Sequence, residues 1–134
     1  MQVYNPRMDT FGKAAVRAKQ LILKSAQSPE KAWESAIAEF TKSALMQTKG
    51  CPKGAFLGLC EAGVIAGIPA GRYGAPVPNP NGQYALEAWQ KLQREPKLSE
   101  NKKKLWDTLK APKNENGQMD VVVWLWRDQP ASTR

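Results

Sequence analysis

The chain has 134 residues, of which 42% are hydrophobic and 24% charged, and its 20 Lys and Arg residues outnumber 12 Asp and Glu residues. This length and composition are typical of one globular domain that folds without cross-links, so wholesale disorder is not expected. The sequence contains no histidine. A Ser-His-Asp triad, a Cys-His pair and an HExxH zinc site are therefore excluded.

The sequence carries no signal for export or membrane insertion. Asp9 and Lys13 interrupt any apolar run near the start, so no secretory signal is expected. No stretch approaches the roughly 20 apolar residues that cross a bilayer. Two cysteines, Cys51 and Cys60, are too few for a disulfide framework. We therefore expect a cytoplasmic protein with two reduced thiols and no membrane contact.

Helical periodicity dominates the first half of the chain. Residues 9–27 place apolar side chains at steps of three and four, which predicts one helical face. The Ser-Pro-Glu sequence at 28–30 is typical of a helix start, and we expect this second helix to end near Thr48 because Gly50 follows.

Residues 51–63 are apolar on nearly every side, which predicts a central, buried helix. Pro52 suits its first turn and Gly63 suits its C-terminal cap. Gly54 and Gly58 are four residues apart and share a face, so a neighbouring helix can approach closely there.

A long loop and two further helices follow. Glycine and proline are so dense in residues 67–82 that neither a helix nor a central strand is expected. Apolar spacing predicts a helix from Tyr84 to near Pro96 and another from Leu98 to just before Pro112.

Residues 119–126 have strong strand propensity, but the chain offers no second strand to pair with them. We therefore predict a buried helix there, and expect residues 130–134 to form a frayed tail. The predicted fold is an all-α, single-domain bundle of about six helices over residues 1–134, with a long Gly/Pro-rich central loop.

The string Cys-Pro-Lys-Gly-Ala-Phe-Leu-Gly-Leu-Cys at 51–60 resembles the signature of a small, uncharacterised bacterial protein family. Tyr-Ala-Leu-Glu-Ala at 84–88 and Asn-Gly-Gln-Met-Asp-Val-Val at 116–122 agree with it. The resemblance spans residues 10–128. It implies a domain of unknown function and carries over no catalytic residue.

Positive charge is concentrated in two regions. Residues 1–28 hold five basic and one acidic residue, and residues 97–117 hold six and three. If the helices in these regions lie side by side, their cations form one face that suits nucleic acid. The candidate binding face is Arg17, Lys24, Lys102, Lys103 and Lys104. The alternative is a solvated surface, since most charge runs make no specific contact.

A second candidate site is a polar pocket around the central helix. Cys51 lies beside a predicted helix start and Lys53, a setting that activates thiols, although a buried thiol that merely packs is the commoner case. Glu61, Glu87 and Asp120 lie in apolar settings and would suit acid–base chemistry or a divalent metal if they met. The candidate pocket comprises Cys51, Lys53, Glu61, Asn81, Tyr84 and Asp120.

Aromatic residues and the loop suggest a third kind of site. Trp33, Trp89 and Trp106 hold periodic core positions, whereas Trp126 beside Arg127 is the best candidate for exposure. No motif predicts a cofactor or a metal. A non-catalytic binding or adaptor domain with a basic face is favoured, and nucleic acid is one partner that such a face would suit. The alternatives are a protein-interaction module or homodimer that uses the loop around Tyr73, and an enzyme with a carboxylate or cysteine centre.

Overall fold

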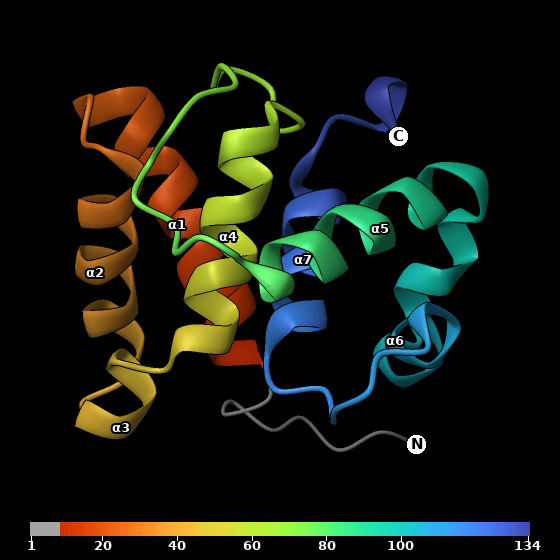
Figure 1. The fold of residues 1–134 in the computed structure, drawn as a ribbon. Helices are drawn as coiled ribbons and strands as arrows, with labels where there is room; N and C mark the ends of the chain where they lie inside the picture. Colours follow the sequence, from red (N-terminus) through yellow and green to blue (C-terminus); the bar gives the residue numbers. More distant parts are fainter. Residues whose placement is uncertain (1–8) are drawn as a thin grey trace.

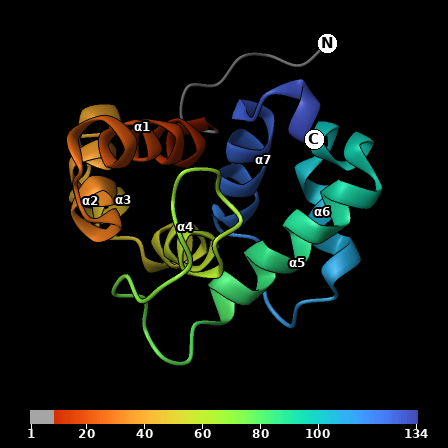
Figure 2. The same ribbon diagram turned by 90° about the horizontal axis from the view of Figure 1, so that it is seen from above.

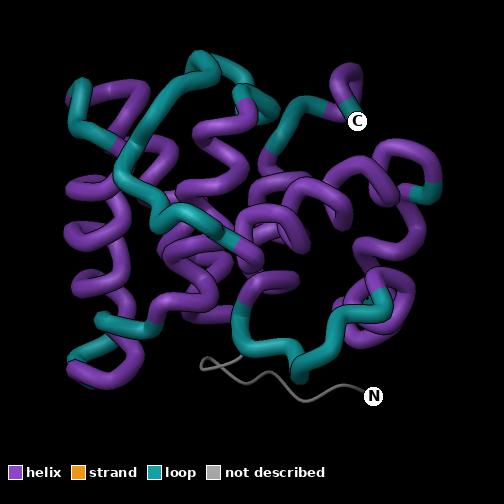
Figure 3. Tube along the Cα trace, in the orientation of Figure 1, coloured by secondary structure: helices purple, strands orange, loops and turns teal. Residues whose placement is uncertain are grey.

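The computed structural model describes residues 9–134, and every regular element in this range is a helix (Figures 1 and 3). The all-α prediction is confirmed. Residues 119–126, whose composition favours a strand, lie within helix α7, Gln118–Asp128. Their side chains are buried except for that of Trp124, so tertiary burial overrides local strand propensity here.

The helices form three groups side by side (Figures 1 and 2). At one edge, α1 (Thr10–Ser25) and α2 (Pro29–Phe40) pack against each other. In the middle, α4 (Gly50–Ala62) lies beside α7. The other edge consists of α5, η2 and α6, which span Pro80–Arg94, Pro96–Glu100 and Lys102–Leu109.

The predicted central position of α4 is confirmed, since α4 packs against α2, α5 and α7. A Cβ atom built on Gly58 would collide with the Cα atom of Gly82 in α5. The two backbones therefore touch, as only glycines permit. At the end of the helix Gly63 adopts a φ of 74°, the left-handed cap expected there.

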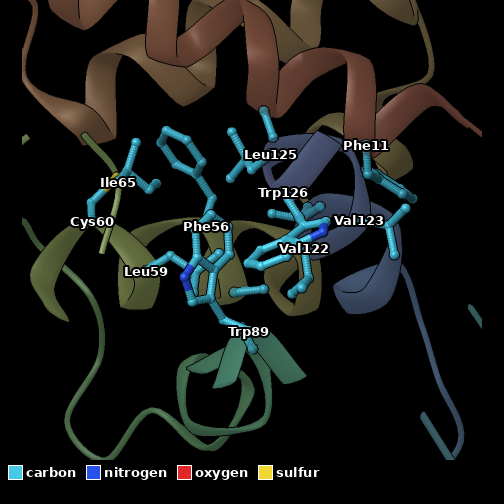
Figure 4. Close-up of a cluster of buried hydrophobic side chains, with 14 of the residues drawn as sticks. Phe11, Phe56, Leu59, Cys60, Ile65, Trp89, Val122, Val123, Leu125 and Trp126 are labelled. Carbon is cyan, nitrogen blue, oxygen red and sulfur yellow. The ribbon is translucent and has the colours of Figure 1, made fainter. Parts of the chain in front are cut away.

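Large aromatic side chains fill the core between these helices (Figure 4). Trp33 tilts against Phe56 with ring centroids 5.4 Å apart, and Trp89 meets Trp126 edge to face at the same distance. The prediction that Trp126 is exposed is wrong, because its side chain is only 1% exposed. Residue Arg127, rather than Trp126, occupies the solvent side of α7 at this point.

The second helix ends earlier than its apolar spacing predicts, at Phe40 rather than Thr48. Short polar side chains interrupt it, because Thr41 Oγ1 accepts a hydrogen bond from Ser43 N and Ser43 Oγ accepts one from Met46 N. A separate turn, α3 (Ala44–Gln47), follows. The break leaves Leu45 79% exposed.

Asparagine caps explain two further differences. Asn79 Oδ1 accepts a hydrogen bond from Gly82 N, so α5 begins at Pro80, before Tyr84. Asn101 Oδ1 accepts from Lys104 N and divides the helix predicted from Leu98 into η2 and α6. The predicted frayed tail contains a 3₁₀ turn, η3 (Ala131–Thr133).

Among residues 9–134, no helix has both the length and the apolar content needed to cross a membrane.

The contact between α4 and α5 generates a stability prediction. Changing Gly58→Ala should lower the free energy of unfolding by about 1–3 kcal/mol, because the added methyl group meets rigid backbone rather than a movable side chain. The control is Gly50→Ala, since a Cβ atom on Gly50 has no neighbour within 4 Å. Urea unfolding of both variants checks this, and equal stability of the two would contradict the close contact.

Candidate functional site

The predicted basic face does not form as one surface, because α7 separates α1 from α6 (Figure 2). Arg17 on α1 pairs with Glu39 of α2 at 3.1 Å. Lys24 is exposed at the far end of α1. The apolar face of α1 packs on α2 and α7, which directs Arg17 and Lys24 away from Lys102, Lys103 and Lys104.

The three consecutive lysines of α6 have three different surroundings. Lys102 Nζ lies 3.1 Å from Asp120 Oδ1 and 3.6 Å from Asp9 Oδ1, so its charge is balanced by carboxylates of the protein itself. Lys103 pairs with Asp107 one turn later at 3.6 Å, on the open surface. Lys104 is exposed and has no ion pair among the described residues. Of the three, Lys104 is the one most available to an external anion.

A larger group of cations surrounds Lys104, and we call residues 90–113 the basic lobe. It comprises the second half of α5, η2, α6 and the loop that follows. It holds eight basic residues and three acidic ones, a net charge of 8 − 3 = +5. Its exposed cations without an ion pair among residues 9–134 are Arg94, Lys97, Lys104, Lys110 and Lys113, of which Lys113 donates a hydrogen bond to Asn81.

One hydrogen bond shows how the lobe brings cations of two helices together. Lys91 Nζ of α5 donates to the Thr108 carbonyl oxygen of α6 at 3.1 Å. Lys104 precedes Thr108 by one helical turn, and Arg94 follows Lys91 by three residues, so Lys104 and Arg94 lie on the neighbouring faces of α6 and α5. Lys91 and Arg94 are not predicted from the sequence, because they precede the basic region that begins at residue 97.

Three of the six predicted pocket residues are connected through the segment 113–118. Asn81 Oδ1 accepts hydrogen bonds from Lys113 Nζ at 2.8 Å and from Gln118 Nε2 at 2.9 Å. The Lys113 ammonium lies 5.6 Å from the centre of the Tyr84 ring. Asn116 Nδ2 lies 3.8 Å from Cys51 Sγ. This polar junction of Cys51, Asn81 and Tyr84 ties the first turns of α4, α5 and α7 to one another.

The other three pocket residues lie in separate contacts. Lys53 Nζ pairs with Glu34 at 3.4 Å, on the α2 side of α4. Glu61 Oε2 accepts the backbone N–H of Tyr73 at 2.7 Å, near the opposite end of α4. Asp120 binds Lys102 beside α1. The six residues therefore do not form one pocket.

The three carboxylates of the alternative acid–base or metal centre also lie in different surroundings. Glu61 binds loop backbone, Asp120 binds Lys102, and Glu87 is exposed on α5. Within residues 9–134 no three His, Cys, Asp or Glu side chains gather closely enough to hold a metal ion. The helices that carry these acids place them on different sides of the core, which their sequence spacing does not reveal.

Tyr73 does not project from the loop as a free anchor for a partner. Its hydroxyl donates to the Pro69 carbonyl oxygen at 2.6 Å, and its ring packs partly against the core. Glu61 Oε2 also accepts the N–H of Ala75 at 3.2 Å, which holds the loop to α4. The exposed apolar side chains at the α2–α3 corner are Phe40 and Leu45 instead.

Asp120 is the most deeply buried charged group of the site, with a side chain 5% exposed. Its Oδ2 accepts the Gly12 N–H at 2.7 Å, while Oδ1 faces Lys102. Burial raises the pKa of this carboxyl above its ordinary value, and the attraction of Lys102 and the Gly12 hydrogen bond oppose that rise only in part.

The comparison with known families gives one match. The family described as "Family of unknown function (DUF6979)" matches residues 8–130. The chain belongs to this family. No curated protein and no solved structure matches the chain significantly. The match agrees with the resemblance to a domain of unknown function and assigns no role to any residue.

The two cysteines of this DUF6979 chain should differ in reactivity. Both are free thiols; Cys60 is fully buried, and burial raises its pKa to about 12. Cys51 is partly exposed. A water-soluble disulfide reagent should therefore modify one thiol in the folded protein and both after unfolding. Cys51→Ala is the control, and rapid modification of Cys60 in that folded variant would contradict its burial.

The raised pKa of Asp120 predicts a pH dependence of stability. The folded protein binds this proton more tightly than the unfolded chain, so the contribution is present at pH values below about 4 and is lost as the pH rises through the folded-state pKa. The stability advantage of the wild type over Asp120→Asn should therefore shrink as the pH rises toward 7. Urea unfolding of both proteins at several pH values measures the difference. A difference that grows with pH would show that the ion pair outweighs burial.

Proposed function

We propose that the chain is a non-catalytic binding domain and that its basic lobe contacts the phosphate groups of nucleic acid. The observation that carries the proposal is the set of exposed, unpaired cations gathered on one part of the surface. Arg94, Lys97, Lys104 and Lys110 lie within 17 residues of sequence on adjoining elements. A cationic surface that neutralises several phosphates releases condensed counterions, which is the main source of sequence-independent affinity.

The distribution of ion pairs supports this surface over others. Near α1, α2 and α4, Arg17, Lys19 and Lys53 are each within 4 Å of a carboxylate oxygen. Their charges are balanced locally, whereas Lys24, Lys31 and Lys42 on the same side are exposed and have no ion pair among the described residues. On the basic lobe Lys103 pairs with an acid of the lobe itself, while Arg94 and Lys97 have no ion-pair partner among the described residues. Residues 90–113 thus carry +5 of the chain's net charge of +8.

The aromatic residue of the lobe favours phosphate contact over base stacking. Trp106 of α6 is buried in the core of the protein. Its Nε1–H donates to the Lys113 carbonyl oxygen at 3.2 Å, and its ring contacts the Tyr84 ring edge to face. Trp106, the aromatic residue of the lobe, is 7% exposed and offers no open face of the kind on which single-stranded bases stack. Backbone contacts position a protein on nucleic acid but read no sequence. The expected binding is sequence-independent.

The contacts described above do not favour the alternative of an enzyme with a carboxylate or cysteine centre. The carboxylates that it needs lie apart, and the Cys60 thiol is buried with a raised pKa. Among the described residues, the hydrogen-bond partner of Cys51 Sγ is the amide of Asn116, which is not a base. A thiol without a neighbouring base lacks the activation that nucleophilic catalysis requires.

The binding proposal predicts a steep salt dependence. The wild type should bind a 20-base-pair duplex at low salt, with an affinity that falls as salt rises. The triple variant Arg94→Gln, Lys97→Gln and Lys104→Gln should reduce the salt slope by roughly 2–3, because about 0.9 counterion is released per phosphate contact. Fluorescence anisotropy at four salt concentrations measures the slope.

The matched control removes the same charge elsewhere. Lys24→Gln, Lys31→Gln and Lys42→Gln change three exposed lysines on and next to α1 and α2, away from the lobe. The control should keep most of the wild-type slope. Equal losses in both triple variants would mean that net charge alone matters, and absence of wild-type binding at low salt would overturn the proposal.

A further inference from the structure

Lys102 differs from every other cation of the basic lobe in its surroundings. Its side chain is 30% exposed, and its Nζ lies between Asp120 Oδ1 at 3.1 Å and Asp9 Oδ1 at 3.6 Å. The exposed Lys103 and Lys104 follow it directly in α6. Both carboxylates attract this ammonium, so we do not expect it to exchange them for a phosphate group in water.

The two carboxylates are themselves fixed by other elements. Asp120 Oδ2 accepts the Gly12 N–H of α1, and Asp9 Oδ1 accepts the Trp124 Nε1–H of α7 at 3.3 Å. The Trp124 ring lies directly against Gly12, where a Cβ atom would collide with it. Through these two carboxylates Lys102, the first residue of α6, is attached to both α1 and α7.

We infer that Lys102 is a positioning residue of the basic lobe, which fixes the start of α6 on the core and presents Lys104 to solvent without contacting phosphate itself. The part of this inference that concerns phosphate rests on the proposed function. The attachment of α6 does not, because it follows from the contacts of Asp9 and Asp120 alone.

The length of α6 makes this attachment consequential. A helix of eight residues is not stable alone in water, so its order depends on tertiary contacts. Leu105 and Trp106 supply apolar contacts, and the Lys102 ion pair holds the N-terminal end. Removing Lys102 leaves the Asp120 carboxylate buried without its cation, which favours local opening at this end.

Amide hydrogen exchange tests the attachment without any ligand. Lys102→Gln should speed exchange in residues 103–109 roughly tenfold while leaving α2 unchanged. Lys102→Arg, which keeps the charge, should restore most of the protection. Lys104→Gln removes a neighbouring exposed charge and should have no effect. Unchanged exchange in Lys102→Gln would overturn the inference. If that variant does not fold, Asp120→Asn removes the same pair while conserving shape and should speed the same amides.

Binding to the 20-base-pair duplex tests the second part. Lys102→Gln should weaken binding without changing the salt slope, whereas Lys104→Gln should lower the slope by about 0.9. An equal fall of the slope in both variants would show that Lys102 is a phosphate ligand and overturn the inference. Unchanged affinity in Lys102→Gln would also overturn it, because Lys102 would then be merely structural. If the wild type binds no duplex, the proposed function fails, and the exchange experiment alone decides the role of Lys102.

Discussion

Two helix backbones meet directly where Gly58 of α4 lies against Gly82 of α5. No side chain separates the helices at this point, so their distance is set by backbone atoms alone. Phe56 and Leu59 of α4 can then reach the core and pack around Trp89 and the residues of α7 (Figure 4). The angle at which α5 leaves this contact also places the basic lobe away from α1 and α2 (Figure 1). The location of the candidate site thus depends on two glycines outside it.

Charge is organised differently on the two edges of the molecule. On the α1–α2 edge, cations such as Arg17 and Lys53 are matched by carboxylates of neighbouring helices. On the opposite edge, most cations of the lobe face solvent and Lys102 faces inward. Unmatched cations also occur on the α1–α2 edge, at Lys24, Lys31 and Lys42, but residues 90–113 hold +5 of the chain's net charge of +8. This asymmetry is the physical basis of the proposed binding surface.

Much of the fold follows from local pattern in the sequence, and the site follows from it only in part. The central position of α4 was predictable because residues 51–63 leave no polar face, and the helical state of residues 119–126 because a strand had no partner. The breaks at Thr41 and Asn101 depend on side-chain hydrogen bonds that compete with helix continuation. The burial of Trp126 depends on its packing against Trp89, far away in sequence.

The candidate site depends still more on tertiary placement. Lys104 was identified from its charge run, but its separation from Arg17 follows from the position of α7 between their helices. The addition of Arg94 to the lobe follows from the way α5 and α6 fold back on each other. The inward turn of Lys102 follows from Asp120, which is 18 residues away in sequence. Charge patterning alone contains none of these distances.

The position of α7 has a consequence for how the protein is made. This helix, from residues 118–128, lies between α1, α4, α5 and α6, yet it follows all of them along the chain. During synthesis the ribosome releases α1 to α6 before their common partner exists, with Phe56, Trp89 and Leu105 lacking their cover. Nascent chains in this state expose apolar surface and are natural clients of chaperones. The core shared by these helices is therefore completed only once the segment rich in valine and tryptophan has emerged.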